Sequence, residues 1–416
     1  MGFAIASTAA SSPVNRVLVA KGLRAFGDGY VSLLLPVYLL DLGFNAWQVG
    51  VVATATLLGS GVLTLVTGLH ARRFRYRALL LAATLLMAAT GLGFAFVTQF
   101  WPLLLIAFVG TLNPSAGDVS VFLPLEHAVL AQLADDRHRT AVFARYSLVG
   151  AFLAAAGSLA AGLPEFAAHA GGVDEPAAIR GMFVLYAMLA GLAALAYRGL
   201  PAQPTAAATA PPAALTTSRR HVFELAALFS VDAFAGGFIV QSMLALWLYQ
   251  AFALSLANAA TLFFAAGILT ALSYLAAARI AARHGLVNTM VFTHLPSSLC
   301  LLAMPFMPAL GFVITLLLVR AALSQMDVPT RSSYVMAIVA PAERPAAASV
   351  TSVPRSLASA VSPLLAGSLL GASSFGWPLL IAGGLKIAYD VLLFARFRKV
   401  RPLEEREMAR DRTRSG

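Results

Sequence analysis

The feature that most constrains this chain is a succession of twelve apolar segments, each long enough to cross a lipid bilayer. A hydrocarbon core about 30 Å thick needs about 20 helical residues, because a helix satisfies its own backbone polar groups there. The segments cover residues 17–41, 46–69, 78–97, 101–125, 141–163, 181–199, 221–249, 256–279, 287–307, 309–337, 347–371 and 377–396. The sequence therefore predicts an all-α membrane protein with 12 transmembrane helices.

A break after the sixth segment predicts the domain organisation. Residues 200–220 are rich in Ala, Pro and Thr, a composition that cannot bury a core, so we expect a cytoplasmic linker there. Residues 1–199 are then an N-terminal six-helix bundle. Residues 221–416 are a C-terminal six-helix bundle with a basic cytoplasmic tail.

The placement of basic residues predicts the orientation. Only 11% of residues are charged, against about 25% in a soluble domain. Much of the net charge of +11 lies in loops, such as the one with Arg72, Arg73, Arg75 and Arg77. In the loops on the other side, Arg180 is the only basic residue apart from His169. By the positive-inside rule, both termini are cytoplasmic in a multi-pass protein of the cell (inner or plasma) membrane. No nucleic-acid partner is expected, because the basic residues do not line a soluble module.

The first apolar segment contains a charged motif, GLRAFGDGY, at residues 22–30. Arg24 and Asp28 are four residues apart, so they share one face of a helix. At about 1.5 Å per residue from Val17, Arg24 lies about 10 Å and Asp28 about 16 Å into the bilayer. An ionisable residue at this depth is a functional-site hypothesis by default. The structural alternative is a static ion network that holds the halves together.

The motif returns half a chain later as VDAFAGGF, at residues 231–238. A shift of 208 aligns its apolar residues and glycine with the first copy and places Asp232 at the position of Arg24. Residues 157–159 likewise repeat as residues 367–369 at a shift of 210. An even number of spans in each half makes the repeats parallel. The chain is therefore expected to form two pseudo-symmetric bundles.

Two loops resemble a signature of the major facilitator superfamily (MFS), roughly G-x-x-A-D-R-x-G-R-R, found between the second and third helices of each half. GLHARRFRYR at residues 68–77 matches through Gly68, Arg73 and Arg77, and the second copy matches through Arg283 and Gly285. Span count, linker position and repeat extend the resemblance over the whole chain. The resemblance implies the MFS fold and alternating access around a site at the membrane midplane.

The chain departs from the family pattern at several places. The acidic residue of the loop signature, which helps to latch the cytoplasmic side closed in the family, is Arg72 in one copy and Ala282 in the other. Glu126 with Arg137 resembles the family's second pair of cytoplasmic charges. A proline-glycine pattern of family exporters has a counterpart only at residues 362–367, SPLLAG.

Charged residues within the segments predict the site. Asp28 and Asp232 are expected to handle a proton or the solute, since an acid beside a cation in a partly wet cavity can exchange a proton. We expect Arg24, Arg320 and Arg355 to compensate these acids. The three arginines could also bind an anion, because their forked donors suit carboxylate or phosphate.

Further charges predict cytoplasmic gate pairs. Asp118 with Arg145, and Asp327 with Arg355, lie at equivalent positions of the two halves. Arg331 lies four residues after Asp327, on the same helix face, and Glu126 is placed with the gate. Permanent pairing within each half is the alternative.

We therefore expect a monomeric secondary active transporter that moves a small organic solute by alternating access, coupled to protons and working as an exporter. The alternatives are an organic-anion uptake carrier and, from another class, a non-transporting membrane receptor or assembly factor on the same fold. No enzyme is expected, because there is no Gly-rich phosphate loop. The seven histidines lack metal spacing, so neither a catalytic residue nor a metal or other cofactor is predicted. The expected partners are the solute, the proton and the lipid bilayer.

Overall fold

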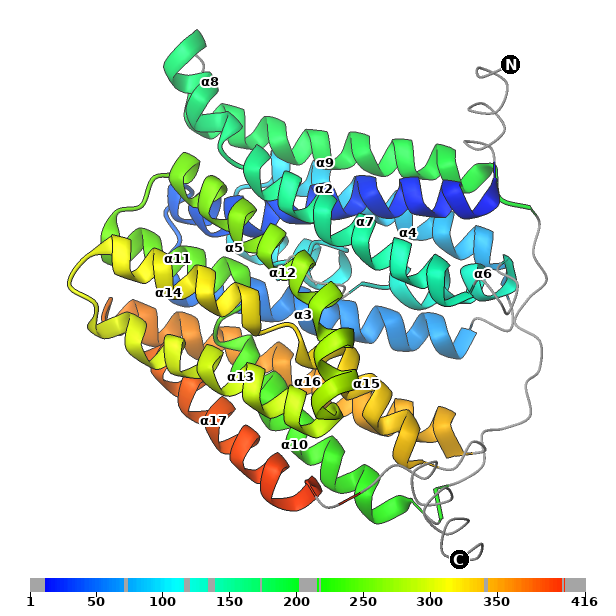
Figure 1. Cartoon of the computed structure of the whole chain (residues 1–416). Coiled ribbons are helices and arrows are strands. Elements are labelled where there is room, and N and C mark those ends of the chain that lie inside the picture. The colour runs from blue at the N-terminus through cyan, green and yellow to red at the C-terminus, as the bar shows by residue number, and fades with distance from the viewer. Residues whose placement is uncertain are drawn as a thin grey trace, which may run out of the picture. The chain divides into compact units, whose positions relative to one another are not determined.

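The computed structural model describes residues 12–70, 74–115, 120–133, 139–172, 174–201, 215–216, 218–339, 343–398 and 400. Within these ranges the chain forms helices and no strand (Figure 1). The prediction of an all-α protein is confirmed.

The residues group into two compact units. Unit 1 contains Met1–Ala208, Val240–Ile268 and Pro363–Ser374, and unit 2 contains Thr209–Ile239, Leu269–Ser362 and Phe375–Gly416. Unit 1 thus adds two stretches of the expected C-terminal bundle to the whole of the expected N-terminal bundle. The division into residues 1–199, 200–220 and 221–416 stays a prediction.

In unit 1, the long helix α2 (Pro13–Asp41) packs against α7 (Arg139–Ala160) and α9 (Glu175–Arg198). Ser12 caps α2 by accepting a hydrogen bond from the backbone N–H of Asn15 at 3.2 Å. Pro13 begins the helix, at a position whose backbone N–H would have no partner within the helix. The other helices wholly within this unit are α3 (Ala46–His70), α4 (Tyr76–Phe96), α5 (Phe100–Val109), α6 (Phe122–Leu133), α8 (Leu163–Gly171) and α11 (Gln241–Phe252).

In unit 2, α13 (Leu286–Ala303) packs against α14 (Leu310–Leu323), α15 (Asp327–Ile338) and α17 (Trp377–Phe397). α10 (Arg219–Gly237) also packs against α17, and η1 (Met304–Phe306) follows α13. Two long helices, α12 (Leu256–His284) and α16 (Arg344–Ala372), contribute residues to both units.

Three of the predicted apolar segments are interrupted rather than continuous. The breaks fall between α5 and α6, between α10 and α11, and between α14 and α15. α10 ends at a glycine pair, Gly236 and Gly237, which weakens helix continuation. Interrupted helices at membrane depth occur where they are buried in protein or line a wet cavity. In the described part, nine helical stretches are long and apolar enough to cross a membrane, and α5 and α14 are shorter apolar helices. The count of twelve spans stays a prediction.

Close helix crossings repeat in the two halves. A Cβ added at Gly29 in α2 would collide with the Ala154 carbonyl oxygen in α7. A Cβ added at Gly237 in α10 would collide with backbone and side-chain atoms of α16, including Ser362. Gly29 aligns with Gly237 at the shift of 208, and α7 aligns with α16 at the shift of 210. The sequence repeat is therefore also a repeat of packing.

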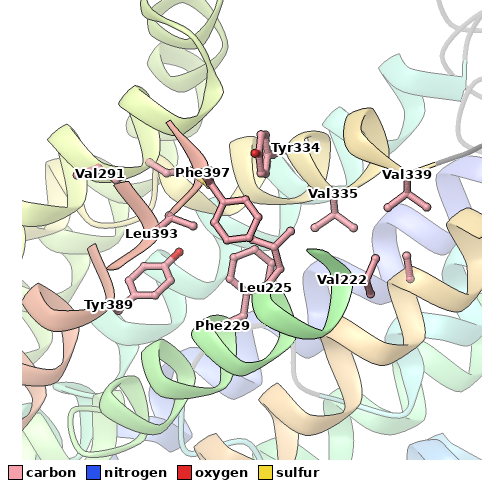
Figure 2. Close-up of a cluster of buried hydrophobic side chains, with 12 residues drawn as sticks. Val222, Leu225, Phe229, Val291, Tyr334, Val335, Val339, Tyr389, Leu393 and Phe397 are labelled. Atoms are coloured by element: carbon pink, nitrogen blue, oxygen red, sulfur yellow. The ribbon is translucent and has the colours of Figure 1, made fainter. Parts of the chain in front are cut away.

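A buried apolar cluster joins the helices of unit 2 (Figure 2). Phe229 and Leu225 extend from α10, and Tyr389, Leu393 and Phe397 extend from α17. The remaining members are Val222, Met290, Val291, Tyr334, Val335, Val339 and Ala347. Because Phe229 precedes Asp232 by one helical turn and Tyr389 precedes Asp390, this apolar cluster borders the charged residues described next.

Candidate functional site

Each unit contains a cluster of buried charges, and the cluster of unit 1 is built around Glu126. Arg24 of α2 forms an ion pair with Glu126 of α6. The hydroxyls of Tyr146 and Tyr197 donate to the same carboxylate at 2.6 and 2.5 Å. Glu126 is fully buried and Arg24 is 3% exposed, with its guanidinium 4.0 Å from the centre of the Phe122 ring. One negative charge thus meets one positive charge and two hydroxyl donors, which suits a permanent anchor.

Asp28 lies one turn beyond Arg24 and is half-buried. The Tyr186 hydroxyl is 3.3 Å from Asp28 Oδ1 and 3.2 Å from the Thr111 carbonyl oxygen. The strong ionic partner of Arg24 is therefore Glu126, whereas Asp28 meets a neutral hydroxyl from α9. Its role as a proton or solute group stays a prediction.

The cluster of unit 2 is built around Asp232 of α10. Lys386 Nζ donates to Asp232 Oδ1 at 2.6 Å, and Arg331 Nη2 donates to Asp232 Oδ2 at 2.8 Å. Asp232 is 6% exposed, Lys386 7% and Arg331 5%. A carboxylate buried this deeply is tolerated because two cations from other helices neutralise it.

A buried histidine extends the cluster of unit 2 to a second carboxylate. His294 Nδ1 of α13 lies 3.0 Å from both carboxylate oxygens of Asp390 in α17. His294 Nε2 lies 3.6 Å from Asp232 Oδ1 and 3.5 Å from Lys386 Nζ. When Nδ1 carries a proton and donates to Asp390, Nε2 is left to accept from Lys386 or to take a proton that faces Asp232.

Arg331 links Asp232 to a third carboxylate. Its Nη2 also forms an ion pair with Asp327, four residues earlier in α15. The guanidinium lies 5.0 Å from the centre of the Phe229 ring and 5.9 Å from that of Tyr389. The apolar cluster thus contacts the cation directly and keeps water from this side of the ion pairs.

Two further arginines lie near this cluster. Arg320, in the last turn of α14, and Arg355, exposed on α16, are within electrostatic reach of Asp232. Arg355 is also within reach of Asp327 and Arg331. The structure therefore brings four predicted charges of unit 2 together with Asp232.

Only some of the predicted gate and loop residues lie in the part of the chain that the structure describes. Glu126 pairs with Arg24. Its predicted partner Arg137 lies outside the described residues, as do Asp118 and Arg73. Arg145 is exposed on α7. The described loop-motif residues lie at helix ends; they are Gly68, Arg77, Arg283 and Gly285. Arg77 donates a hydrogen bond to the Leu200 carbonyl oxygen at 3.2 Å. Gly285 has a positive φ of 86°. The gate pairs stay predictions.

The sequence did not single out His294, Lys386 or Asp390 as site residues. Lys386 and Asp390 are four residues apart in an apolar segment, the spacing already used for Arg24 with Asp28. That pattern could have identified them. His294 gave no such spacing, since its partners lie 92 and 96 residues away in the chain. No group of three or more His, Cys, Asp or Glu suited to a metal ion occurs among the described residues.

Comparison with known proteins gives consistent matches. A family model described as Major Facilitator Superfamily matches residues 17–324 and 226–415. The uncharacterized membrane protein YJR124C of Saccharomyces cerevisiae is 23% identical over 437 residues, which cover 96% of this chain and 97% of that protein.

Solved structures share the fold at low sequence identity. The nucleoside transporter NupG gives a TM-score of 0.70 at 15% identity, over 92% of this chain and 99% of that one. The human organic anion transporter MFSD10 (TETRAN) gives a TM-score of 0.63 at 18% identity, over 91% of this chain and 98% of that one.

Proposed function

The chain belongs to the Major Facilitator Superfamily, and from this premise we propose that it is a proton-coupled secondary transporter of a small organic solute. It is a membrane transporter rather than an enzyme, with a small molecule as its substrate. Coupling to protons, alternating access and export are the parts that we propose.

The observation that carries the proposal is the contact of His294 with two carboxylates. His294 Nδ1 is 3.0 Å from Asp390, and His294 Nε2 is 3.6 Å from Asp232 Oδ1. Imidazole is the side chain whose charge changes most readily near neutral pH. A proton arriving at Nε2 would make an imidazolium held between Asp390 and Asp232, and would compete with Lys386 for Asp232. Protonation and the pairing of Asp232 are thereby linked.

This link provides a way to couple a proton to solute movement. Asp232, Lys386 and His294 lie on α10, α17 and α13 respectively, so a change of partner at Asp232 alters the attraction between three helices. Coupling needs such a differential interaction between conformations. Asp28 is the group that we propose to line the solute path in the first half. For Arg24 we adopt the static alternative, because its charge is matched by Glu126.

Alternating access is supported by the composition of unit 1. Residues from the second half belong to this unit: the backbone N–H of Ala257 donates to Glu165 at 2.6 Å, and the backbone N–H of Leu364 donates to the Thr54 hydroxyl at 2.9 Å. Contacts of this kind must break when the opposite side opens. Export is the direction that we propose, from the SPLLAG pattern at residues 362–367. The alternative is a carrier that takes up an organic anion.

Proteoliposomes loaded with a pH-sensitive dye test the proposal. Nucleosides, organic acids and organic cations are added one at a time, and proton movement is recorded with and without an imposed pH gradient. We expect at least one compound to drive proton movement through the wild-type chain. Arg198→Gln, at an exposed arginine of α9, is the control substitution. Solute flux without proton movement would refute coupling, and no flux of any compound would favour a receptor or assembly factor.

A further inference from the structure

The helix α16 has two exposed faces of opposite character. Val353, Leu357, Val361 and Leu365 form an apolar face and are 48%, 51%, 43% and 41% exposed. The second face is polar, and its members are Ser349, Ser352, Arg355, Ser356 and the half-buried Ser359. At about 100° per residue, these polar positions lie within an arc of about 120°, separate from the apolar face.

The polar face is not suited to lipid. α16 has 29 residues, enough to cross the hydrocarbon core, yet it is absent from the nine stretches apolar enough to do so. An arginine and four serines on one side of a helix explain why. Because a charge exposed to hydrocarbon is costly, the polar face must meet water or a polar ligand, whereas the apolar face meets lipid.

In the described part of the chain, guanidinium atoms without a hydrogen-bond partner lie within electrostatic reach of Arg355 on this face and of Asp232. Arg331 is 5% exposed, and its Nε and Nη1 have no hydrogen-bond partner among the described residues. The same holds for Arg320 Nε and the Tyr389 hydroxyl. Buried donors are satisfied in most native structures, so several of them without partners in one region indicate a ligand that accepts hydrogen bonds.

The charges of the same region do not balance. Counting described residues in contact with Asp232 or within its electrostatic reach, the cations are Arg331, Lys386, Arg320 and Arg355. The carboxylates are Asp232, Asp327 and Asp390. His294 apart, four positive charges face three negative ones. One further negative charge would neutralise the region.

We propose that Arg331, Arg355 and Arg320, beside the polar face of α16, bind the carboxylate of a small organic monoacid. The carboxylate site rests on the proposed function, because it names the class of solute that the transporter carries. Arg355 meets the carboxylate first, since it is exposed on the polar face. Arg331 then donates from Nη1, which has no partner among the described residues, while its Nη2 stays on Asp232 and Asp327.

Thermal unfolding of the purified full-length chain tests this site without requiring transport. The probes are pairs of an acid and its amide: benzoate with benzamide, nicotinate with nicotinamide, lactate with lactamide, and indole-3-acetate with indole-3-acetamide. The members of each pair match in size and differ in charge. A ligand that binds only the folded chain raises its Tm. We expect at least one acid, and not its amide, to raise the Tm.

Substitution of Arg355 locates the site. Arg355→Gln should abolish the shift while leaving the Tm without ligand unchanged, because the side chain is exposed. Arg355→Lys keeps the charge but loses the forked pair of donors. It is expected to weaken binding of the acid about tenfold, as loss of one hydrogen bond to a charged group would. Arg198→Gln is the matched control at another exposed arginine and should retain the full shift.

Three results would overturn the carboxylate site. They are equal shifts by acids and amides, no shift by any acid of the panel, and an undiminished shift in Arg355→Gln. The test also separates this site from the proposed function. Acid-specific binding without solute-driven proton movement would leave the site standing and refute coupled transport. Coupled transport of an amide, with no binding of its acid, would refute the carboxylate site and leave coupled transport standing.

Discussion

The two halves of the chain place ion pairs on equivalent helices with their charges exchanged. In the first half, Arg24 of α2 pairs with Glu126 of α6. In the second half, Asp232 aligns with Arg24 and pairs with Arg331 of α15. Each pair joins the first helix of its half to the helix that follows the break in the fourth predicted segment of that half.

The surroundings of these two pairs differ. Glu126 is enclosed by one arginine and two tyrosine hydroxyls. Asp232 has two cationic partners, a histidine at 3.6 Å and a link through Arg331 to a further carboxylate. A repeated packing frame can therefore hold a closed anchor in one half and an exchangeable charge cluster in the other.

The largest expected effect is on stability, from removal of Glu126. Glu126→Leu leaves Arg24 buried without its counter-charge, and should destabilise the chain by about 3–5 kcal/mol. Chemical unfolding of the purified protein measures this loss.

The double variant Arg24→Met with Glu126→Leu sharpens the same comparison. Replacing both partners of a buried pair by apolar residues is often neutral or stabilising, so most of the lost stability should return. A double variant as unstable as Glu126→Leu would show that the first cluster is more than a charge-matched anchor.

The second prediction concerns the pH dependence of transport. His294 faces Asp232, Lys386, Asp390 and, at 5.9 Å between ring centres, Tyr389. Because His294 is the group that we propose to take the coupling proton between Asp390 and Asp232, His294→Gln should flatten the pH dependence of the rate of solute-driven proton movement.

The matched control for His294→Gln is His221→Gln, at a histidine near Phe397. That variant should keep the wild-type pH profile. An unchanged profile in His294→Gln would remove this histidine from the proton path.

The smallest expected effect concerns the glycine crossings. Gly29→Ala and Gly237→Ala each force a methyl group against backbone atoms of the neighbouring helix, and should each cost about 1–3 kcal/mol. Gly191→Ala is the control, because its added Cβ meets open space. Unequal losses at the two crossings, measured by chemical unfolding, would argue against equivalent packing of the halves.

The sequence was sufficient for the fold because length and apolarity dictate membrane helices, and the repeat follows from matched residues at a nearly constant shift of 208 to 210. It also drew attention to Arg24, Asp232, Asp327 and Arg331, which form buried ion pairs, since a charge within an apolar segment stands out. Their roles in transport stay predictions. The pairing of Asp327 with Arg331 follows from helical spacing alone.

Partners on different helices could not be found in this way. Glu126 lies 102 residues from Arg24, and Lys386 lies 154 residues from Asp232. No local spacing connects residues that far apart, and only the packing of helices brings them together. For the same reason, Glu126 was expected near Arg137 rather than at Arg24.

The central claim is that the cluster around Asp232 exchanges the coupling proton whereas the pair of Arg24 and Glu126 serves as an anchor. Solute-driven proton movement in proteoliposomes, compared between Asp232→Asn and the double variant Arg24→Met with Glu126→Leu, tests it most directly. We predict that Asp232→Asn folds and loses proton movement, and that the double variant retains it. Proton movement that survives in Asp232→Asn and disappears in the double variant would contradict the claim.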